Sequence, residues 1–323
     1  MKRKLLLLAA FLVLLYNNCF CWGFFAHKKI NYYAVFLLPP EMMVLYKPNI
    51  IFLSEHAVDP DKRRYMLKEE GSRHYIDIDR YGQLPFRELP RNWNEAIARF
   101  GEDSVRANGI VPWWIQIMLQ RLTKAFKDKD ETRILKLSAE IGHYIADSHV
   151  PLHACHNHNG QFTGQKGIHG FWESRVPELL ADKEYNFFIG KADYIPDPSK
   201  FIWARVLESA AASDSVLLKE KELSATFAVD QKFAFEGRNN LMVRQYSAAY
   251  TIAYDKKLNG MIERRMRQSV YSIASFWYTA WVNAGQPDLK NLIHREFSPE
   301  DLKEFEVLNT HWNNDTLKSL ECH

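Results

Sequence analysis

The segment from residue 143 to residue 173 holds six of the twelve histidines of the chain, with one aspartate and one glutamate at recurring short spacings. His143 and Asp147 are four residues apart, and so are His169 and Glu173. In a helix, residues four apart project from one face, so each pair would present an imidazole and a carboxylate together. This spacing predicts a site for more than one metal ion.

A third candidate ligand lies between the two pairs. Pro151 is expected to end the first helix, which leaves His153 in a loop where it can turn toward a second ion. Histidine nitrogens combined with carboxylate oxygens suit zinc, whereas carboxylates alone would suit magnesium or calcium. The thiol of Cys155 is a less favoured ligand, because enough imidazole and carboxylate ligands exist without it.

The elements that must position these side chains are helices. Apolar residues recur at three- and four-residue steps in most of the chain after residue 92, and no alternating strand series or internal repeat is visible. The segments that follow this rule are 92–100, 113–126, 133–147, 202–219, 241–254 and 261–281. Gly260 either divides the last two segments or is tolerated within one helix. We therefore expect an all-α fold in a single domain.

The N-terminal 21 residues are typical of a secretory signal peptide. Lys2, Arg3 and Lys4 precede an apolar run, and small cysteine side chains stand three residues and one residue before Trp22. Cleavage before Trp22 would leave a mature domain of residues 22–323. Export then predicts a secreted or periplasmic location. It would also permit, without requiring, a disulfide between Cys155 and Cys322.

The overall charge gives no reason to expect a nucleic-acid or anionic-membrane partner. Three of the 42 lysines and arginines lie in the signal segment, so the rest equal the 39 aspartates and glutamates in number. A local basic patch remains possible. Residues 264–267 include three arginines, and 276–281 are rich in aromatic residues; a solvated face and core packing are the expected roles of these two segments.

Cleavage before Trp22 would give a chain that begins W-G-F-F-A-H, with a free amine on Trp22 and an imidazole at His27. With the histidines and carboxylates above, this start resembles the superfamily of zinc-dependent phospholipases C and single-strand-specific zinc nucleases. Members of that superfamily use the amine and carbonyl of an N-terminal tryptophan as metal ligands. The resemblance covers residues 22–173 and implies a multi-helix domain that holds three zinc ions.

The superfamily also uses an aspartate and a histidine about fifteen residues apart, upstream of the main motif. Asp59 and His74 have this spacing, and Asp61 is the alternative to Asp59. The resemblance then implies three ligand sets: Asp59, His74, His143 and Asp147 for the first ion; His153, His169 and Glu173 for the second; and Trp22, His27 and a second oxygen of Asp147 for the third.

The same resemblance suggests roles in catalysis and substrate binding. Asp59 would orient or deprotonate the attacking water while it also contacts a zinc ion. One cation among Lys62, Arg63 and Arg64 would stabilise charge in the transition state, unless these residues form an exposed basic turn. Tyr75 and Asp77 follow His74 where the nucleases bind a base, although Tyr75 could equally be a packed core residue.

These features together predict an exported trinuclear-zinc phosphodiester hydrolase. Clustered zinc ions suit in-line displacement at phosphorus. The short interval between His153 and His169, and the glutamate at 173, favour a phospholipase C-like enzyme over the alternative, a single-strand nuclease. A zinc-binding module without turnover is a further alternative. The expected partner is a phosphodiester substrate, either phospholipid or single-stranded nucleic acid. No stable protein partner is inferred, and contact with a membrane is expected only through a lipid substrate.

Overall fold

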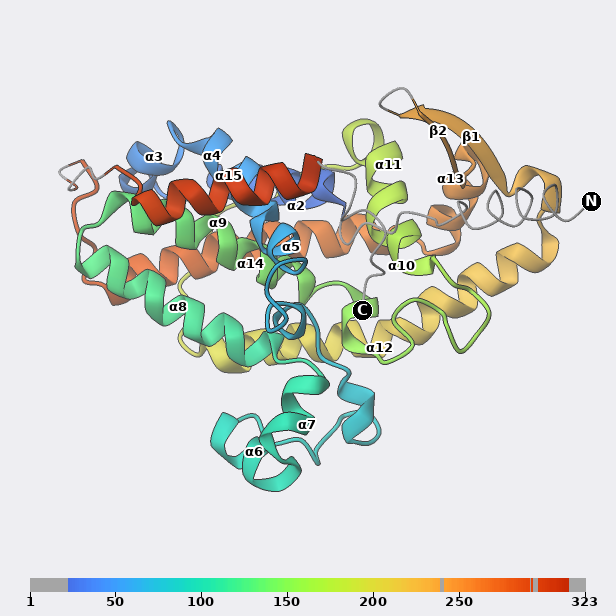
Figure 1. Ribbon diagram of the computed structural model, residues 1–323, viewed down its shortest axis with the longest axis horizontal. Coiled ribbons are helices and arrows are strands. Elements are labelled where there is room, and N and C mark those ends of the chain that lie inside the picture. Colours follow the sequence, from blue (N-terminus) through green and yellow to red (C-terminus); the bar gives the residue numbers. More distant parts are fainter. Residues whose placement is uncertain (1–22, 239–240, 291, 293–295, 314–323) are drawn as a thin grey trace, which may run out of the picture.

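The computed structural model describes residues 23–238, 241–290, 292 and 296–313. Most of these residues are helical, which confirms the expected helical character. The α-helices, shown in Figure 1, are α2 (Phe24–Val35), α3 (Pro40–Tyr46), α4 (Ile50–Glu55), α5 (Asp59–Arg63), α6 (Trp93–Phe100), α7 (Glu102–Ala107), α8 (Val111–Lys127), α9 (Glu131–Asp147), α10 (Ile168–Gly170), α11 (Val176–Glu184), α12 (Pro198–Thr226), α13 (Ala248–Lys257), α14 (Met261–Asn283) and α15 (Pro299–Asn313). Single turns of other helix types are η1 (His56–Val58), η2 (Gly71–Arg73), η3 (Ile78–Tyr81), η4 (Pro151–Ala154), η5 (Phe171–Arg175) and η6 (Val229–Gln231). The expected signal peptide, Trp22 and Cys322 lie outside the described residues.

Helix α9 is the central element of the helical core. Every residue from Ser138 to Asp147 is buried, as expected for a helix that other helices surround. Helices α2, α4, α8 and α14 pack against it, and α12 packs against α8. Asp130 caps the N-terminus of the helix, because its carboxylate accepts a hydrogen bond from the amide of Arg133. The two metal-ligand candidates on α9, His143 and Asp147, therefore lie at the buried end of the helix.

Two side-chain caps and a glycine mark where α12, α13 and α14 begin. Asp197 caps α12 and Ser247 caps α13, each through a side-chain oxygen that accepts from a backbone amide three residues later. Gly260 has φ of 67° at the start of α14, a left-handed conformation that a glycine adopts readily. Gly260 therefore divides α13 from α14. Within the described chain, no helix has the length and apolar character that a membrane crossing requires.

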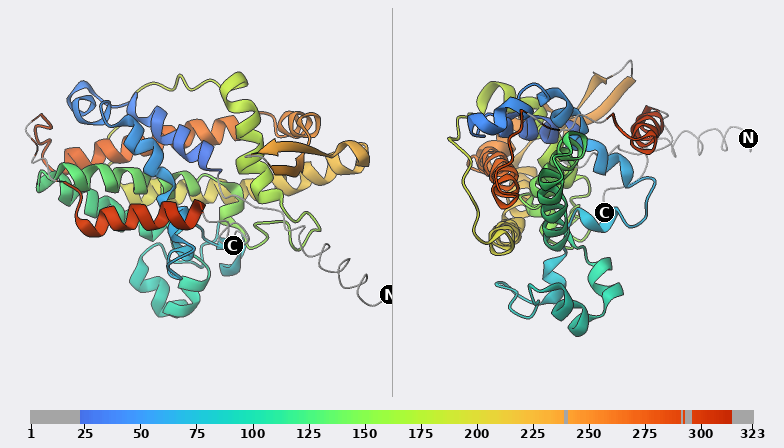
Figure 2. Two further views of the ribbon diagram at one scale, coloured as in Figure 1. Left: turned by 45° about the horizontal axis from the view of Figure 1, so that its top comes forward. Right: turned by 90° about the vertical axis from the view of Figure 1, so that its left-hand side faces the viewer.

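One segment differs from the sequence-based expectation. Residues 241–254 were expected to form one helix, but only the part from Ala248 onward is helical. Leu241–Tyr246 is strand β2, which pairs antiparallel with β1 (Phe233–Arg238) in a hairpin. The short apolar run at 241–243 fits a strand as well as a helix, and contacts with η5 hold the strand in place. The hairpin projects at one end of the molecule, beside α13 (Figure 2).

Helix α15 packs along α5, the short helix that follows η1. Its contacts are polar and aromatic: Glu304 accepts from Arg63, Asn309 accepts from Lys62, and Phe305 lies 4.4 Å from the ring centre of His56. Residues from the C-terminal part of the chain thus fix the orientation of α5, which carries both aspartates considered as metal ligands.

Candidate metal centre

Buried imidazoles and carboxylates from six helical elements and from His74, which follows η2, meet in one place. They form three groups, and within each group the ligand atoms lie within 4.8 Å of one another. The groups are His27, Asp61 and His143; His74, His143 and Asp147; and His153, His169 and Glu173. We call these eight residues the donor cluster. Seven of them had been proposed as metal ligands from the sequence, and Asp61 had been the alternative to Asp59. These groups could hold metal ions.

A close approach of α2 to α9 brings His27 into the cluster. Gly142 leaves room for the side chain of Asn31: a Cβ at position 142 would lie 2.2 Å from the Asn31 amide oxygen. The Asn31 amide nitrogen in turn donates to the carbonyls of Leu53 and Ala139. One turn earlier on α2, the ring of His27 stacks on that of His143, with 3.9 Å between the ring centres. Gly142, next to His143 in α9, therefore allows the close approach that places His27 in the cluster.

Asp147 is the centre of the first part of the cluster. Its Oδ2 lies 3.0 Å from Nδ1 of His74 and 3.2 Å from Nε2 of His143. Its Oδ1 lies 3.3 Å from Nε2 of His27 and 4.0 Å from Nε2 of His153. The two oxygens of this carboxylate thus face different histidines, as a carboxylate that bridges two metal ions would.

The second part of the cluster comes from three short elements: His153 lies in η4, His169 in α10 and Glu173 in η5. Glu173 Oε2 lies 3.0 Å from Nε2 of His169 and 3.4 Å from Nε2 of His153. Nδ1 of His153 donates to the carbonyl of His74, which joins this part to the first. Residues 171–175 form a turn of π-helix, a distortion that often accompanies functional sites. The sequence spacing of His169 and Glu173 correctly predicted that the pair would share a face.

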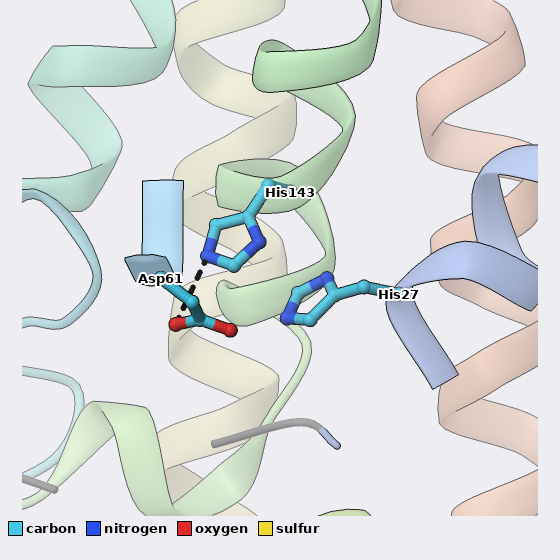
Figure 3. Close-up of side chains that lie close together, drawn as sticks. All are labelled: His27, Asp61 and His143. Carbon is cyan, nitrogen blue, oxygen red and sulfur yellow. Dashed lines mark ion pairs between the residues drawn. The ribbon is translucent and has the colours of Figure 1, made fainter. Parts of the chain in front are cut away.

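Of the two aspartates of α5, Asp61 is the one that lies among the histidines. Asp61 Oδ1 lies 3.6 Å from Nε2 of His143 and 3.7 Å from Nδ1 of His74. Figure 3 shows Asp61 and the imidazoles of His27 and His143 directed toward one another. Asp59, which had been preferred, instead pairs with His56 at 2.6 Å and is not in the cluster. Residues two apart on a helix do not share a face, so only one of the two aspartates can point at the histidines.

The cations preferred from the sequence also point elsewhere. Lys62 lies 3.2 Å from Asp59 and donates to Asn309 of α15. Arg63 donates to Glu140 at 2.5 Å and to Glu304 at 2.8 Å. Their charges are therefore used in packing α5 against α9 and α15, and neither reaches the donor cluster.

Arg64 is the member of the basic triplet that lies at the cluster. Its Nη1 is 3.8 Å from Oδ1 of Asp61. Burial and, to a smaller extent, the positive charge of Arg64 lower the pKa of His169 to about 3. A three-residue step along α5 thus places a cation beside Asp61. From the sequence, Arg64 was one of three candidates for the cation that stabilises charge in the transition state. If Asp61 is the metal ligand, Arg64 is the candidate that lies beside it.

Groups outside the cluster orient its imidazoles. Nδ1 of His143 donates to the carbonyl of Ala57 at 2.8 Å, which leaves Nε2 directed at the carboxylates. Nε2 of His74 lies 3.7 Å from Glu70, whose carboxylate also accepts from the hydroxyl of Tyr144. Partners of this kind fix the ring orientation and tautomer of metal-binding histidines. Glu70 was not identified from the sequence, where nothing separates it from the acidic residues around it.

The electrostatics of the cluster favour a cation. Burial alone would lower the pKa of His143, but the carboxylates of Asp147 and Asp61 raise it to about 9. Burial and the neighbouring His143 together lower the pKa of His27 to about 4. Burial also raises the pKa of Glu173 to about 7. The carboxylates thus draw a proton onto one imidazole, and a metal ion at the same place would compete with that proton.

Unsatisfied ligand atoms give a direct test of whether the cluster fits a metal. Within the described residues, both oxygens of Asp61, Oδ1 of Asp147, Nε2 of His153 and Oε1 of Glu173 are buried without a hydrogen-bond partner. Each such group costs about 1–3 kcal/mol when it is left unpaired. Because these atoms face one another across short distances, coordinated cations would satisfy them together. The residues present therefore fit metal ions.

The two expected substrate-binding residues lie outside the three groups. The hydroxyl of half-buried Tyr75 donates to the carbonyl of Ala107 at 3.0 Å. The carboxylate of Asp77 lies 3.1 Å from Nδ1 of His156, and burial raises the pKa of Asp77. The polar atoms of both residues are thus engaged within the protein.

Cys155, a lesser candidate for a ligand, is not in the donor cluster. Its thiol is buried, and burial raises its pKa well above the usual value. It lines a cavity of about 540 Å³ between α12 and the loop after η4, which also includes Asp79, Asp214 and Lys221. None of the eight donor residues lines this cavity, so it is a separate feature of the described chain.

No model of a known protein family matches this chain. A search of curated proteins likewise finds no match.

Proposed function

We propose that this protein is a zinc-dependent phosphodiester hydrolase of the phospholipase C and zinc nuclease superfamily. One observation carries the proposal: buried histidines and carboxylates that are far apart in the sequence converge in three adjoining groups. Metal ions held a few ångströms apart are a common device for displacement at phosphorus. A multi-helix fold of that superfamily's type belongs to the same proposal.

The proposed ligand sets are those that the superfamily resemblance implies, with Asp61 in the place of Asp59. Asp61, His74, His143 and Asp147 would hold one ion, and His153, His169 and Glu173, which form one group in the structure, a second. A third would be held by His27, by the other oxygen of Asp147, and by the amine and carbonyl of Trp22 after removal of a signal peptide. The second set has three protein ligands, which leaves a coordination position open, as catalytic zinc sites require.

When bound, zinc ions supply Lewis-acid chemistry that activates water near neutral pH and polarises phosphoryl oxygens. Asp61 can orient the attacking water and accept its proton, because its two oxygens have no hydrogen-bond partner in the described chain. Arg64 supplies a fixed positive charge 3.8 Å from Asp61, where it can stabilise charge that develops on the phosphoryl oxygens. The Ala57 carbonyl holds the imidazole of His143 in the required orientation, and the carboxylate of Glu70 lies 3.7 Å from Nε2 of His74.

We propose a phospholipid-like substrate in preference to nucleic acid. The short interval between His153 and His169 and the glutamate at 173 support this choice. The nuclease alternative relies on Tyr75 and Asp77 to bind a base, yet the hydroxyl of Tyr75 and the carboxylate of Asp77 already have partners within the protein. Export through a signal peptide, to the periplasm or beyond the cell, is part of the same proposal.

The proposal is tested with the purified protein that begins at Trp22, with its zinc content measured by mass spectrometry. Its activity is measured on phosphatidylcholine vesicles, single-stranded DNA and RNA side by side, with the Asp147→Asn variant as control. Cleavage of lipid alone, abolished in the variant, supports the proposal. Cleavage of nucleic acid alone would select the nuclease instead, and bound zinc without any turnover would favour a zinc-binding module.

A further inference from the structure

The β1–β2 hairpin has an apolar face that runs from the core to solvent. The register pairs Phe233 with Tyr246, Phe235 with Arg244 and Gly237 with Met242. Paired residues of an antiparallel hairpin share a face, and so do residues two apart along each strand. Phe233, Phe235, Met242, Arg244 and Tyr246 therefore lie on one side of the hairpin.

The base of this face is packed and its outer part is exposed. The ring of Tyr246 stacks on Phe171 of η5, with 3.8 Å between the ring centres. Farther along the strands, Phe235 is 67% exposed and Met242 is 68% exposed. Val229, in the turn that precedes β1, is 85% exposed. An exposed group of large apolar side chains on a projecting element is typical of an interaction surface.

The hairpin is held firmly next to the donor cluster. Arg175 lies two residues after Glu173, and its guanidinium donates to Glu236 at 2.6 Å and to the carbonyl of Tyr246 at 3.0 Å. Glu236 also accepts from Gln245. The hairpin is thus attached through a buried arginine to the same turn that carries a proposed metal ligand.

The charge of the hairpin indicates which partner its apolar face would meet. Residues 229–246 include three basic residues, Lys232, Arg238 and Arg244, and two acids, Asp230 and Glu236. Glu236 is neutralised by Arg175, and Lys232 pairs with Glu220. The guanidinium of Arg244 lies 3.6 Å from the ring centre of Phe233, so a cation borders the apolar face itself. Apolar side chains bordered by arginine suit the boundary between the acyl chains and the anionic headgroups of a bilayer.

We propose that this hairpin docks the protein on an anionic phospholipid bilayer, with Phe235 and Met242 entering the interface and Arg244 pairing with lipid phosphate. The sequence alone led us to expect membrane contact only through a lipid substrate, so the hairpin adds a direct contact. Docking does not depend on the proposed hydrolysis. It would hold η5 and the donor cluster near the membrane surface.

The test is co-sedimentation of the purified protein with vesicles of phosphatidylcholine, alone or mixed with phosphatidylglycerol. We expect binding to the mixed vesicles that weakens as salt is added. Phe235→Ser combined with Met242→Ser should weaken it by on the order of tenfold for each side chain. Phe188→Ser is the matched control, because Phe188 is 88% exposed but lies outside the hairpin. Thermal unfolding checks that the variants remain folded.

Absence of wild-type binding to the mixed vesicles would overturn the proposal, and so would equal binding by the double variant or an equal loss in Phe188→Ser. Hydrolysis of soluble bis-p-nitrophenyl phosphate is measured on the same samples. Vesicle binding without that hydrolysis would support docking and count against the proposed enzyme. Hydrolysis without vesicle binding would do the opposite.

Discussion

Two polar clusters share helix α5, one wholly buried and one partly exposed at α15, and they differ in how their charges are satisfied. The partly exposed one, which we call the arginine network, consists of Arg63, Glu70, Glu140, Glu304 and Lys136. Arg63 lies 2.5 Å from Glu140, 2.8 Å from Glu304 and 3.6 Å from Glu70, and Lys136 pairs with Glu304 at 2.8 Å. Each acid of this network therefore faces a cation supplied by the chain.

The donor cluster lacks that balance. Asp61, Asp147 and Glu173 meet five imidazoles, and several of their oxygens have no hydrogen-bond partner in the described part of the chain. A buried polar set whose charges pair internally is suited to hold helices together, whereas a set that leaves ligand atoms facing one another is suited to coordinate a cation. The arginine network is therefore suited to a structural role and the donor cluster to metal binding, although Arg63 and Asp61 are only two residues apart on α5.

Removal of metal should have the largest effect, and only the donor cluster should respond. Each ion present at a thousand times its dissociation constant stabilises the folded protein by about 4 kcal/mol. We expect a chelator to abolish phosphodiesterase activity and to lower the melting temperature strongly, and added zinc to restore both. Calorimetry with and without chelator measures the change. A melting temperature that ignores the chelator would contradict the assignment.

Arg63→Met should have the next largest effect, and it should fall on stability. Loss of the guanidinium leaves buried Glu140 without its nearest cation, which costs about 3–5 kcal/mol, whereas Glu70 keeps Arg73 at 2.5 Å. Urea unfolding measures this cost, and zinc content measured under native conditions serves as the control. If the variant kept its stability and lost only catalysis, Arg63 would belong to the active site after all.

Asp61→Asn and Asp59→Asn form a matched pair on the same helix. Asp61→Asn should lower kcat/KM by about 100-fold and reduce bound zinc, because it removes a carboxylate from the donor cluster. Asp59→Asn should remain near wild type in zinc content, because its carboxylate pairs with His56 and Lys62. The reverse order of effects would restore Asp59 as the ligand.

Glu304→Gln should have a small effect, because it weakens a partly exposed contact of α15. We expect a loss below about 1 kcal/mol in urea unfolding at neutral pH. Burial would raise the pKa of Glu304, but Arg63 and Lys136 lower it overall. A lowered folded-state pKa means that the contact stabilises the protein above the unfolded value of about 4.3 and is lost as the pH falls through the folded value. The difference from wild type should therefore disappear in acid, and a difference that persists there would contradict this account.

Much of the fold could be predicted from the sequence because apolar residues recur at three- and four-residue steps along the long helices. The periodic segments at 113–126, 133–147, 202–219 and 261–281 correspond to α8, α9, α12 and α14. Strand β2 could not be predicted in this way, because its apolar residues fit a helical period as well. Its conformation depends on pairing with β1 and on contacts with Phe171 and Arg175, which are distant in sequence.

The candidate site was predictable where ligands share a helix turn and ambiguous where they do not. His143 with Asp147, and His169 with Glu173, follow from a four-residue step. The choice between Asp59 and Asp61 depends on how α5 is rotated, which α15 and α9 determine through Lys62 and Arg63. His149 shows that a four-residue spacing is no guide outside a single helix. It lies four residues before His153, but its ring is in the core, where Nδ1 donates to the carbonyl of Ile145 and Nε2 lies beside the hydroxyl of Ser272.

Crystals of the protein that begins at Trp22, grown with zinc and measured at the zinc absorption edge, would test the central claim most directly. The account predicts anomalous density at the donor cluster, bounded by Asp61, Asp147 and Glu173, and none at the arginine network. A donor cluster without anomalous density, with its carboxylates and imidazoles hydrogen-bonded to one another, would contradict it.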